Sequence, residues 1–181
     1  MGIPKEPKPA KLFMSLIFSE VEILSQGLGD LKRQFGEIDV LSKVLPFDFT
    51  NYYNKEMGSN LKRHFVTFER LIPIPSLPQI KRLTNDLELK YADLQGNRRI
   101  NIDPGYLCLE HVILATTKGY THRPYLREGI FADLTLIYRD KSYRPLEWTY
   151  PDYRQEEVIG LFNQFRRKYL EDLKREGHEG C

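Results

Sequence analysis

A single apolar run at residues 12–18 most constrains how this chain can fold. The run is interrupted only by Ser15. A short continuous apolar segment of this kind is typical of a β-strand that is buried on both faces. The Ser-Glu-Val-Glu stretch at residues 19–22 follows directly and matches a capping box, in which side chains satisfy the free backbone N–H groups of a helix start. The sequence therefore predicts a central strand that leads directly into a helix.

Three amphipathic helices and several strands are expected in total. Apolar residues recur at steps of three and four after residues 21, 77 and 158. A second capping box begins at Ser76, and Asp152 is expected to cap the last helix. Beyond the first strand, we expect strands at 38–49, 61–70, 97–103, 112–117, 130–138 and 143–148. The last two should form a hairpin that turns at Asp140 and Lys141.

This order of elements predicts an α+β fold. It reads βαββαβ, extended by strands and a final helix, which favours a largely antiparallel sheet with helices on one face and an elaborated ferredoxin-like core. The 181 residues, 41% of them hydrophobic, fit a single domain spanning 1–181. Within it, the basic, Pro-rich segment 1–11 is expected to be a leader and 177–181 a frayed tail.

Composition excludes several classes of function. The net charge of +2 is too small for the overall electrostatic footprint of a protein dedicated to binding duplex nucleic acid, so the charge does not indicate a nucleic-acid partner. The two cysteines, Cys108 and Cys181, cannot build a disulfide framework or a Cys-rich zinc site. No apolar run is long enough to span a membrane, and no Gly-x-x-x-x-Gly-Lys-Ser/Thr phosphate loop occurs. We therefore expect a soluble, cytoplasmic protein that does not associate with membranes.

Basic and hydroxyl side chains in the middle of the chain predict an anion site. Basic residues outnumber acidic ones between residues 97 and 127. Thr116, Thr117 and Lys118 lie at the end of a predicted strand and offer hydroxyl and ammonium donors. Arg123 could hold a phosphate through two parallel hydrogen bonds, and for this reason it is expected to contribute more to binding than Lys118. The expected ligand is a phosphate-bearing small molecule or a nucleotide.

Asp103 and His122 are the candidate catalytic residues. Asp103 precedes Pro-Gly, a pair expected to form a turn, and its carboxylate could act as an acid or a base; His122 can gain a charge near neutral pH. In the alternative interpretation, Asp103 only bonds the amides of the turn. Tyr106, Tyr150 and Trp148 could stack on a base or ring, and Tyr52 is a further candidate for ligand binding. We expect Asp103, Tyr106, Lys118, His122 and Arg123 to converge.

The aromatic-rich loop at residues 47–53 is expected to cover one side of this site. Its aromatic side chains would create an aggregation liability if they all faced solvent. Carboxylates next to predicted strands, together with His122, could bind a metal ion, but their spacing does not require it. We assign no metal ligands, and the cofactor is unknown.

Three segments carry a resemblance to a known family. They are the Asn-Ile-Asp-Pro-Gly-Tyr stretch at 101–106, the aromatic segment 46–53 and the Trp-Thr-Tyr-Pro-Asp-Tyr stretch at 148–153. Together they resemble the DUF4416 family of uncharacterised prokaryotic proteins, over nearly the whole chain. The family is recognised by Leu-Asp-Pro-Gly-Tyr, and here Ile102 replaces the leucine. The resemblance implies no established activity.

Two classes of function therefore compete. The first is a small-molecule or nucleotide site built around Asp103 and the segment from Thr116 to Arg123. The second is a protein interaction module, or a homo-oligomeric structural protein, without catalysis. Side chains that converge on a concave pocket favour the first, and a flat apolar patch favours the second.

Overall fold

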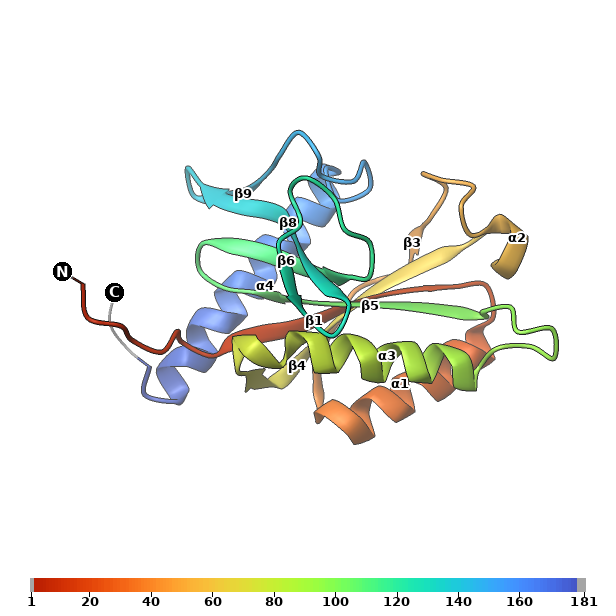
Figure 1. Ribbon diagram of the computed structural model, residues 1–181, viewed down its shortest axis with the longest axis horizontal. Coiled ribbons are helices and arrows are strands. Elements are labelled where there is room, and N and C mark those ends of the chain that lie inside the picture. The colour runs from red at the N-terminus through yellow and green to blue at the C-terminus, as the bar shows by residue number, and fades with distance from the viewer. Residues whose placement is uncertain (1, 179–181) are drawn as a thin grey trace.

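The computed structural model describes residues 2–178, and within them a nine-stranded antiparallel sheet is flanked by four α-helices (Figure 1). The helices are α1 (Val21–Phe35), α2 (Asn54–Met57), α3 (Leu77–Lys90) and α4 (Glu156–Arg175). The strands are β1 (Ala10–Phe18), β2 (Ile38–Leu41), β3 (Leu45–Pro46), β4 (Lys62–Ile72), β5 (Ile100–Leu107), β6 (His111–Thr116), β7 (Tyr125–Arg127), β8 (Ile130–Arg139) and β9 (Ser142–Pro145). A 3-10 turn, Ile74–Ser76, precedes α3. The predicted α+β class is confirmed.

The strand order explains how the sheet is built. Along the sheet it runs β2-β4-β1-β5-β6-β8-β7, while β3 pairs with β4 and β9 pairs with β8. The first four of these strands, with α1 and α3 as their connections, have the antiparallel order of a ferredoxin-like unit. Strands β6 to β9 extend this unit along the edge formed by β5. The predicted ferredoxin-like core is therefore present, and the later strands enlarge it.

Strand β1 lies at the centre, as its apolar run predicts. All nine of its residues are buried, and it pairs antiparallel with β4 on one side and β5 on the other. The strand begins at Ala10, so Lys11 belongs to the sheet and not to the expected leader. The expected tail at 177–181 lies partly outside the described residues, because 179–181 are not described.

Helices cover both faces of the sheet. Helices α1 and α3 share one face, where Phe35 of α1 packs against Phe68 of β4, and Asp30 of α1 accepts a 2.5 Å hydrogen bond from Lys90 of α3. Helix α4 packs on the opposite face, where Phe162 meets the ring of Phe13 in β1 edge to face at 4.9 Å. Helices on one face were expected, and α1 and α3 fit that pattern. Helix α4 leaves the other face only partly covered.

The helix starts differ from the expected caps. Helix α1 has Glu20 at its N-cap without a side-chain bond, because the Glu20 carboxylate pairs with Arg99 instead. The Ser76 hydroxyl donates to the carbonyl of Pro73 and not to the first turn of α3. Asp152 lies before the N-cap of α4 and pairs with Arg63. All three capping predictions were wrong: Glu20 and Asp152 have long-range ionic partners, and the Ser76 hydroxyl bonds the preceding turn.

Two strand predictions had different outcomes. The hairpin of β8 and β9 is confirmed, and Asp140 and Lys141 at its turn both have positive φ, as a primed two-residue turn requires. The continuous strand expected at 38–49 is wrong. The chain breaks after β2, where the Ser42 hydroxyl accepts the N–H of Phe65 at 2.9 Å. A side chain thereby takes a place that a strand carbonyl would otherwise fill.

A buried ionic cluster connects β1, β2 and α4. The Lys11 ammonium is fully buried, pairs with Asp39 of β2, and lies 2.6 Å from the carboxylate of Asp172 in α4. Asp172 also accepts from Lys168 at 2.8 Å. Each buried charge in this cluster therefore has an opposite charge beside it, as burial demands.

Candidate functional site

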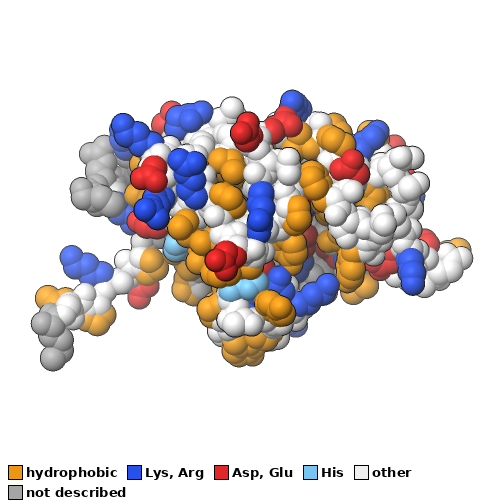
Figure 2. Space-filling view, turned by 90° about the horizontal axis from the view of Figure 1, so that it is seen from above, with side chains coloured by type: hydrophobic (Ala, Val, Ile, Leu, Met, Phe, Trp, Pro, Cys, Tyr) orange, Lys and Arg blue, Asp and Glu red, His pale blue; other side chains and the backbone are white. Residues whose placement is uncertain are grey.

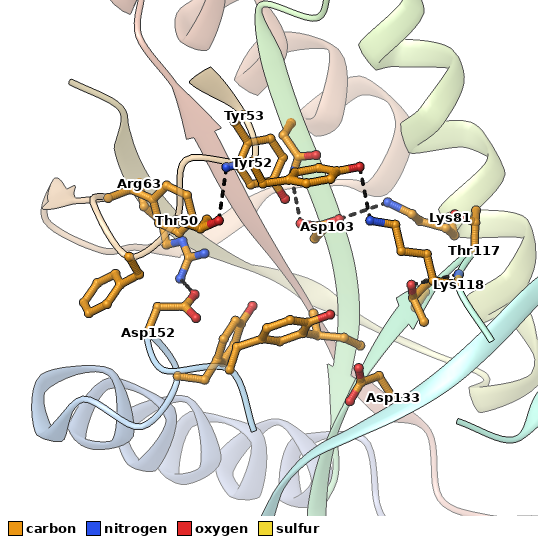
Figure 3. Close-up of a pocket in the computed structure, with 18 of the residues that line it drawn as sticks. Thr50, Tyr52, Tyr53, Arg63, Lys81, Asp103, Thr117, Lys118, Asp133 and Asp152 are labelled. Carbon is orange, nitrogen blue, oxygen red and sulfur yellow. Dashed lines mark hydrogen bonds and ion pairs between the residues drawn. The ribbon is translucent and has the colours of Figure 1, made fainter. Parts of the chain in front are cut away.

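A cavity of about 540 Å³ lies beside β5 on the α4 face of the sheet (Figure 3). It opens where β5 and β6 separate. These strands pair only from Gly105 to Leu107, and before Gly105 they diverge. Its polar lining includes Arg63, Lys81, Asn85, Glu88, Arg98, Asn101, Asp103, Thr116, Thr117, Lys118, Asp133 and Asp152.

The Asp-Pro-Gly sequence creates this separation from within a strand. A turn was expected after Asp103, and that prediction was wrong: Pro104 and Gly105 both lie inside β5. Pro104 has no N–H to donate and precedes the first residue paired with β6. Gly105 is required by close packing, because a Cβ there would lie 2.3 Å from the Ile113 carbonyl and 2.5 Å from the Phe13 ring. Proline and glycine therefore set the point at which pairing with β6 begins.

Two side chains of α3 satisfy the open edge of β5. Glu88 accepts the N–H of Ile102 at 2.6 Å, and Lys81 donates to the Ile102 carbonyl at 3.2 Å. Buried backbone groups need such partners when no neighbouring strand supplies them. The sequence analysis did not identify Lys81 or Glu88 as candidate site residues. Their signal is the spacing of Lys81, Asn85 and Glu88, which places three polar residues along one side of an otherwise amphipathic helix.

Alternation along β5 separates the residues of the motif. Asn101 and Asp103 line the cavity, whereas Tyr106, an odd number of residues away from both, belongs to the opposite face of the strand. There Tyr106 is 8% exposed and its ring lies 5.9 Å from that of His111. The expectation that Tyr106 converges with Asp103 on one site was therefore wrong.

Asp103 presents an ionised carboxylate to the cavity. It accepts hydrogen bonds from Lys81 at 3.1 Å and from Asn101 at 2.7 Å. Burial alone would raise the pKa of Asp103, but the charge and hydrogen bond of Lys81 outweigh it and hold the pKa below its ordinary value. Asp103 is thus suited to accept hydrogen bonds from a bound molecule.

Glu88 has the opposite electrostatic environment. Burial raises its pKa to about 7, although the nearby Lys81 and Arg98 act in the other direction. Its second oxygen lies 3.5 Å from Arg98, which also holds Glu56 of α2. The cavity therefore contains one carboxylate that is ionised and one that holds a proton up to neutral pH, which is the combination that acid–base chemistry uses.

Replacing Glu88 by glutamine should change how stability depends on pH. Because the folded state raises this pKa from 4.5 to about 7, the native wild type loses stability as pH rises through this interval. The glutamine keeps the oxygen that accepts from Ile102 and never ionises. We expect the Glu88→Gln protein to gain stability over the wild type between pH 5 and pH 8, by on the order of 3 kcal/mol. Urea unfolding of both proteins at the two pH values measures this, and a difference that is independent of pH would contradict it.

Lys118 contacts the aromatic loop. Its ammonium lies 3.1 Å from the Tyr52 hydroxyl and 4.2 Å from the centre of the Tyr52 ring. Thr116 accepts the Lys118 N–H at 3.1 Å, and Thr117 lies between them on the cavity wall. The cavity lining thus includes Tyr52, Thr116, Thr117 and Lys118, all of which the sequence singled out for ligand binding.

The loop at 47–53 forms one side of the cavity, as predicted. Phe47, Phe49, Tyr52 and Tyr53 contribute to the lining. Phe47 is buried against Tyr53, with ring centres 5.8 Å apart, whereas the Tyr52 side chain is exposed. The loop is therefore anchored by its first aromatic residue and presents others to the cavity.

Arg123 and His122 lie behind the cavity rim. The Arg123 guanidinium donates to Asp133 at 2.7 Å, to the Tyr150 hydroxyl at 2.6 Å and to the Lys118 carbonyl at 3.2 Å. The His122 ring stacks on Trp148 at 4.8 Å, and its Nε2 lies 3.6 Å from Asp133. Neither residue lines the cavity, although Asp133 and Tyr150 do. Arg123 therefore holds the rim together instead of offering a free fork to a phosphate.

Charges in and around the cavity are mixed. Within the described chain, no group of three or more His, Cys, Asp and Glu residues is placed to hold a metal ion. On the face shown in Figure 2, Lys and Arg side chains are interspersed with Asp and Glu.

Between residues 2 and 178, no helix combines the length and apolar character needed to cross a membrane.

Comparison with known proteins places the chain in a family. The family model described as a domain of unknown function, DUF4416, matches residues 8–169. The chain belongs to the DUF4416 family. The matched range of this DUF4416 protein contains every residue that lines the cavity. A search of curated proteins found no match, and a search of solved structures found none.

Proposed function

We propose that this DUF4416 protein binds a phosphate-bearing small molecule in the cavity, with the phosphate at Lys118. The observation that carries the proposal is the position of the Lys118 ammonium. Among the described residues it contacts Tyr52 and pairs with no carboxylate, while the other basic residues of the lining are all paired. A cation without a counter-charge, placed at a cavity, favours an anionic partner.

The surroundings of Lys118 suit a phosphate group. The hydroxyl groups of Thr116 and Thr117 add hydrogen-bonding capacity on the same wall, and the Tyr52 hydroxyl adds another on the facing loop. Charge-assisted hydrogen bonds of this kind are stronger than bonds between neutral groups. We therefore assign the phosphate to Lys118. Arg123, which donates to the Lys118 carbonyl, positions the loop that carries Lys118.

The remainder of the cavity would contact the rest of the ligand. Its volume of about 540 Å³ falls within the range of small-molecule pockets, roughly 300 to 1,000 Å³. The Asp103 carboxylate can accept hydrogen bonds from hydroxyl or amino groups, and the aromatic loop offers ring faces. This concave, convergent arrangement supports a small-molecule site over a flat interaction surface.

Replacing Lys118 by alanine should weaken the binding of phosphate compounds. The loss of a charge-assisted contact of about 1.5 to 3 kcal/mol predicts a decrease in affinity of roughly tenfold to a hundredfold. Isothermal titration calorimetry with ribose 5-phosphate, at low and high salt, measures this, because an ionic contact weakens with screening. Lys32→Ala is the matched control, since Lys32 belongs to α1 and pairs with Glu37 outside the cavity. Absence of binding to the wild type, or equal affinity in Lys118→Ala, would refute the proposal.

A further inference from the structure

A second recognition point lies across the cavity from Lys118. There Arg63 of β4 and Asp152 of the segment before α4 form a buried pair, 5% and 6% exposed (Figure 3). The Arg63 guanidinium is surrounded by aromatic rings, with the ring centre of Phe47 at 4.4 Å and that of Tyr153 at 5.3 Å. Both charged residues line the cavity.

Both members of this pair keep unused hydrogen-bonding capacity. Arg63 donates to one oxygen of Asp152 through Nη1, and its Nε is buried without a partner in the part of the chain that the structure describes. The other oxygen of Asp152 accepts no hydrogen bond from the described residues but, unlike Arg63 Nε, it is not a fully buried atom. Buried polar atoms without partners are rare in folded proteins, so the unused Nε–H of Arg63, in a pair whose carboxylate keeps a free oxygen, indicates a place for another group.

The charge of the pair limits what that group can be. Arg63 and Asp152 already neutralise each other, so a buried anion or cation added here would leave one charge uncompensated. A neutral group that offers an acceptor to the guanidinium and a donor to the carboxylate avoids this cost. Phe47 and Tyr153 also belong to the cavity lining, and this apolar surrounding suits the flat ring of a heterocycle.

We propose that the Arg63–Asp152 pair recognises the edge of a planar heterocycle that carries an acceptor next to a donor, as nucleobases do. This inference rests on the proposed binding of phosphate at Lys118 and names the class of ligand: a nucleoside monophosphate. Its base would lie at Arg63 and Asp152, its sugar hydroxyls within reach of Asp103, and its phosphate at Lys118.

The test compares ligands on the wild-type protein, so it does not depend on a variant that folds. Calorimetry with ribose 5-phosphate and with the monophosphates of adenosine, guanosine, uridine and cytidine gives affinities for the same sugar phosphate with and without a base. At least one nucleotide should bind about tenfold more tightly than ribose 5-phosphate, because a base would satisfy the unused donor and acceptor. Equal affinities would overturn this inference and leave the phosphate site intact. Absence of binding by all five compounds would overturn both.

An Asp152→Asn substitution provides the second arm. It retains the size of the side chain and removes its charge, so it should weaken the binding of the preferred nucleotide by about tenfold and leave ribose 5-phosphate binding unchanged. Near-ultraviolet circular dichroism confirms that the variant is folded before the titration. Loss of affinity for both ligands to the same extent would show that the pair acts on the cavity as a whole and would contradict recognition of a base.

Discussion

Replacing Gly105 by alanine is expected to destabilise the protein by roughly 3 kcal/mol. The added Cβ would lie 2.3 Å from the carbonyl oxygen of Ile113 and 2.5 Å from the ring of Phe13. A backbone atom cannot move aside as a flexible side chain can, so β5 and β6 must separate where their pairing begins. Overpacking of this kind costs about 1 to 3 kcal/mol, and sometimes more. Urea unfolding monitored by circular dichroism measures the effect.

Gly160→Ala is the matched control for this substitution. Gly160 lies inside α4, and a Cβ there would meet no atom within 4 Å. Because alanine has the higher helix propensity, this variant should be more stable than the wild type by about 0.5 to 1 kcal/mol. Wild-type stability in Gly105→Ala would contradict the account of how the strand pair opens, since that account requires a glycine at the junction.

Replacing Lys11 by methionine is expected to cost about 3 to 5 kcal/mol, because it leaves two buried carboxylates without their shared cation. Lys11 lies between Asp39 and Asp172, and neither its side chain nor that of Asp172 is exposed to solvent. Methionine retains most of the length of lysine, so the loss reflects charge more than volume. Lys168→Met is the control, since Lys168 is partly exposed and should cost about 1 kcal/mol or less. Equal losses in both variants, measured by urea unfolding, would contradict this account of the cluster.

The same cluster predicts a loss of stability in acid. Burial alone would raise the pKa of Asp172, but hydrogen bonds from Lys11 and Lys168 hold it below its ordinary value. A carboxyl group with a lowered pKa stabilises the fold above its unfolded pKa, and that contribution is lost as pH falls through the folded pKa. The Lys11→Met protein lacks the strongest of these partners. Its stability deficit should therefore shrink at low pH, where Asp172 is protonated in both proteins.

The sequence predicted the fold where the signal was local. The apolar run around Ser15 located the central strand, and the helical spacing after residues 21, 77 and 158 located α1, α3 and α4. The helix caps failed because a short polar pattern cannot show that Glu20 pairs with Arg99, or that Asp152 pairs with Arg63. Such partners lie far apart along the chain and meet only after folding.

The candidate site was predictable in part. The end of a predicted strand identified Thr116, Thr117 and Lys118 as candidates, and the aromatic content of the loop identified Tyr52. All four residues line one cavity. Tyr106 was misplaced because a turn at Pro-Gly was assumed, whereas a continuous strand puts it on the opposite face.

The residues that sequence reasoning missed depend on long-range geometry. The role of Lys81 and Glu88 can be recognised only in the structure, because it depends on where β5 separates from β6. The Arg63–Asp152 pair likewise joins residues 89 positions apart in the chain. The polar spacing of Lys81, Asn85 and Glu88 could have indicated a polar side of α3, but no local pattern could have indicated the contacts that these residues make.

The most direct test of phosphate binding at Lys118 is a map of the amide signals that respond to ligand. Two-dimensional ¹H–¹⁵N nuclear magnetic resonance spectra would be recorded during titration with ribose 5-phosphate, before and after the Lys118→Ala substitution. The proposal predicts the largest shifts at Thr116, Thr117, Lys118 and the loop at 50–53, and their loss in the variant. Shifts centred on the α1 and α3 face of the sheet, or undiminished shifts in Lys118→Ala, would contradict it.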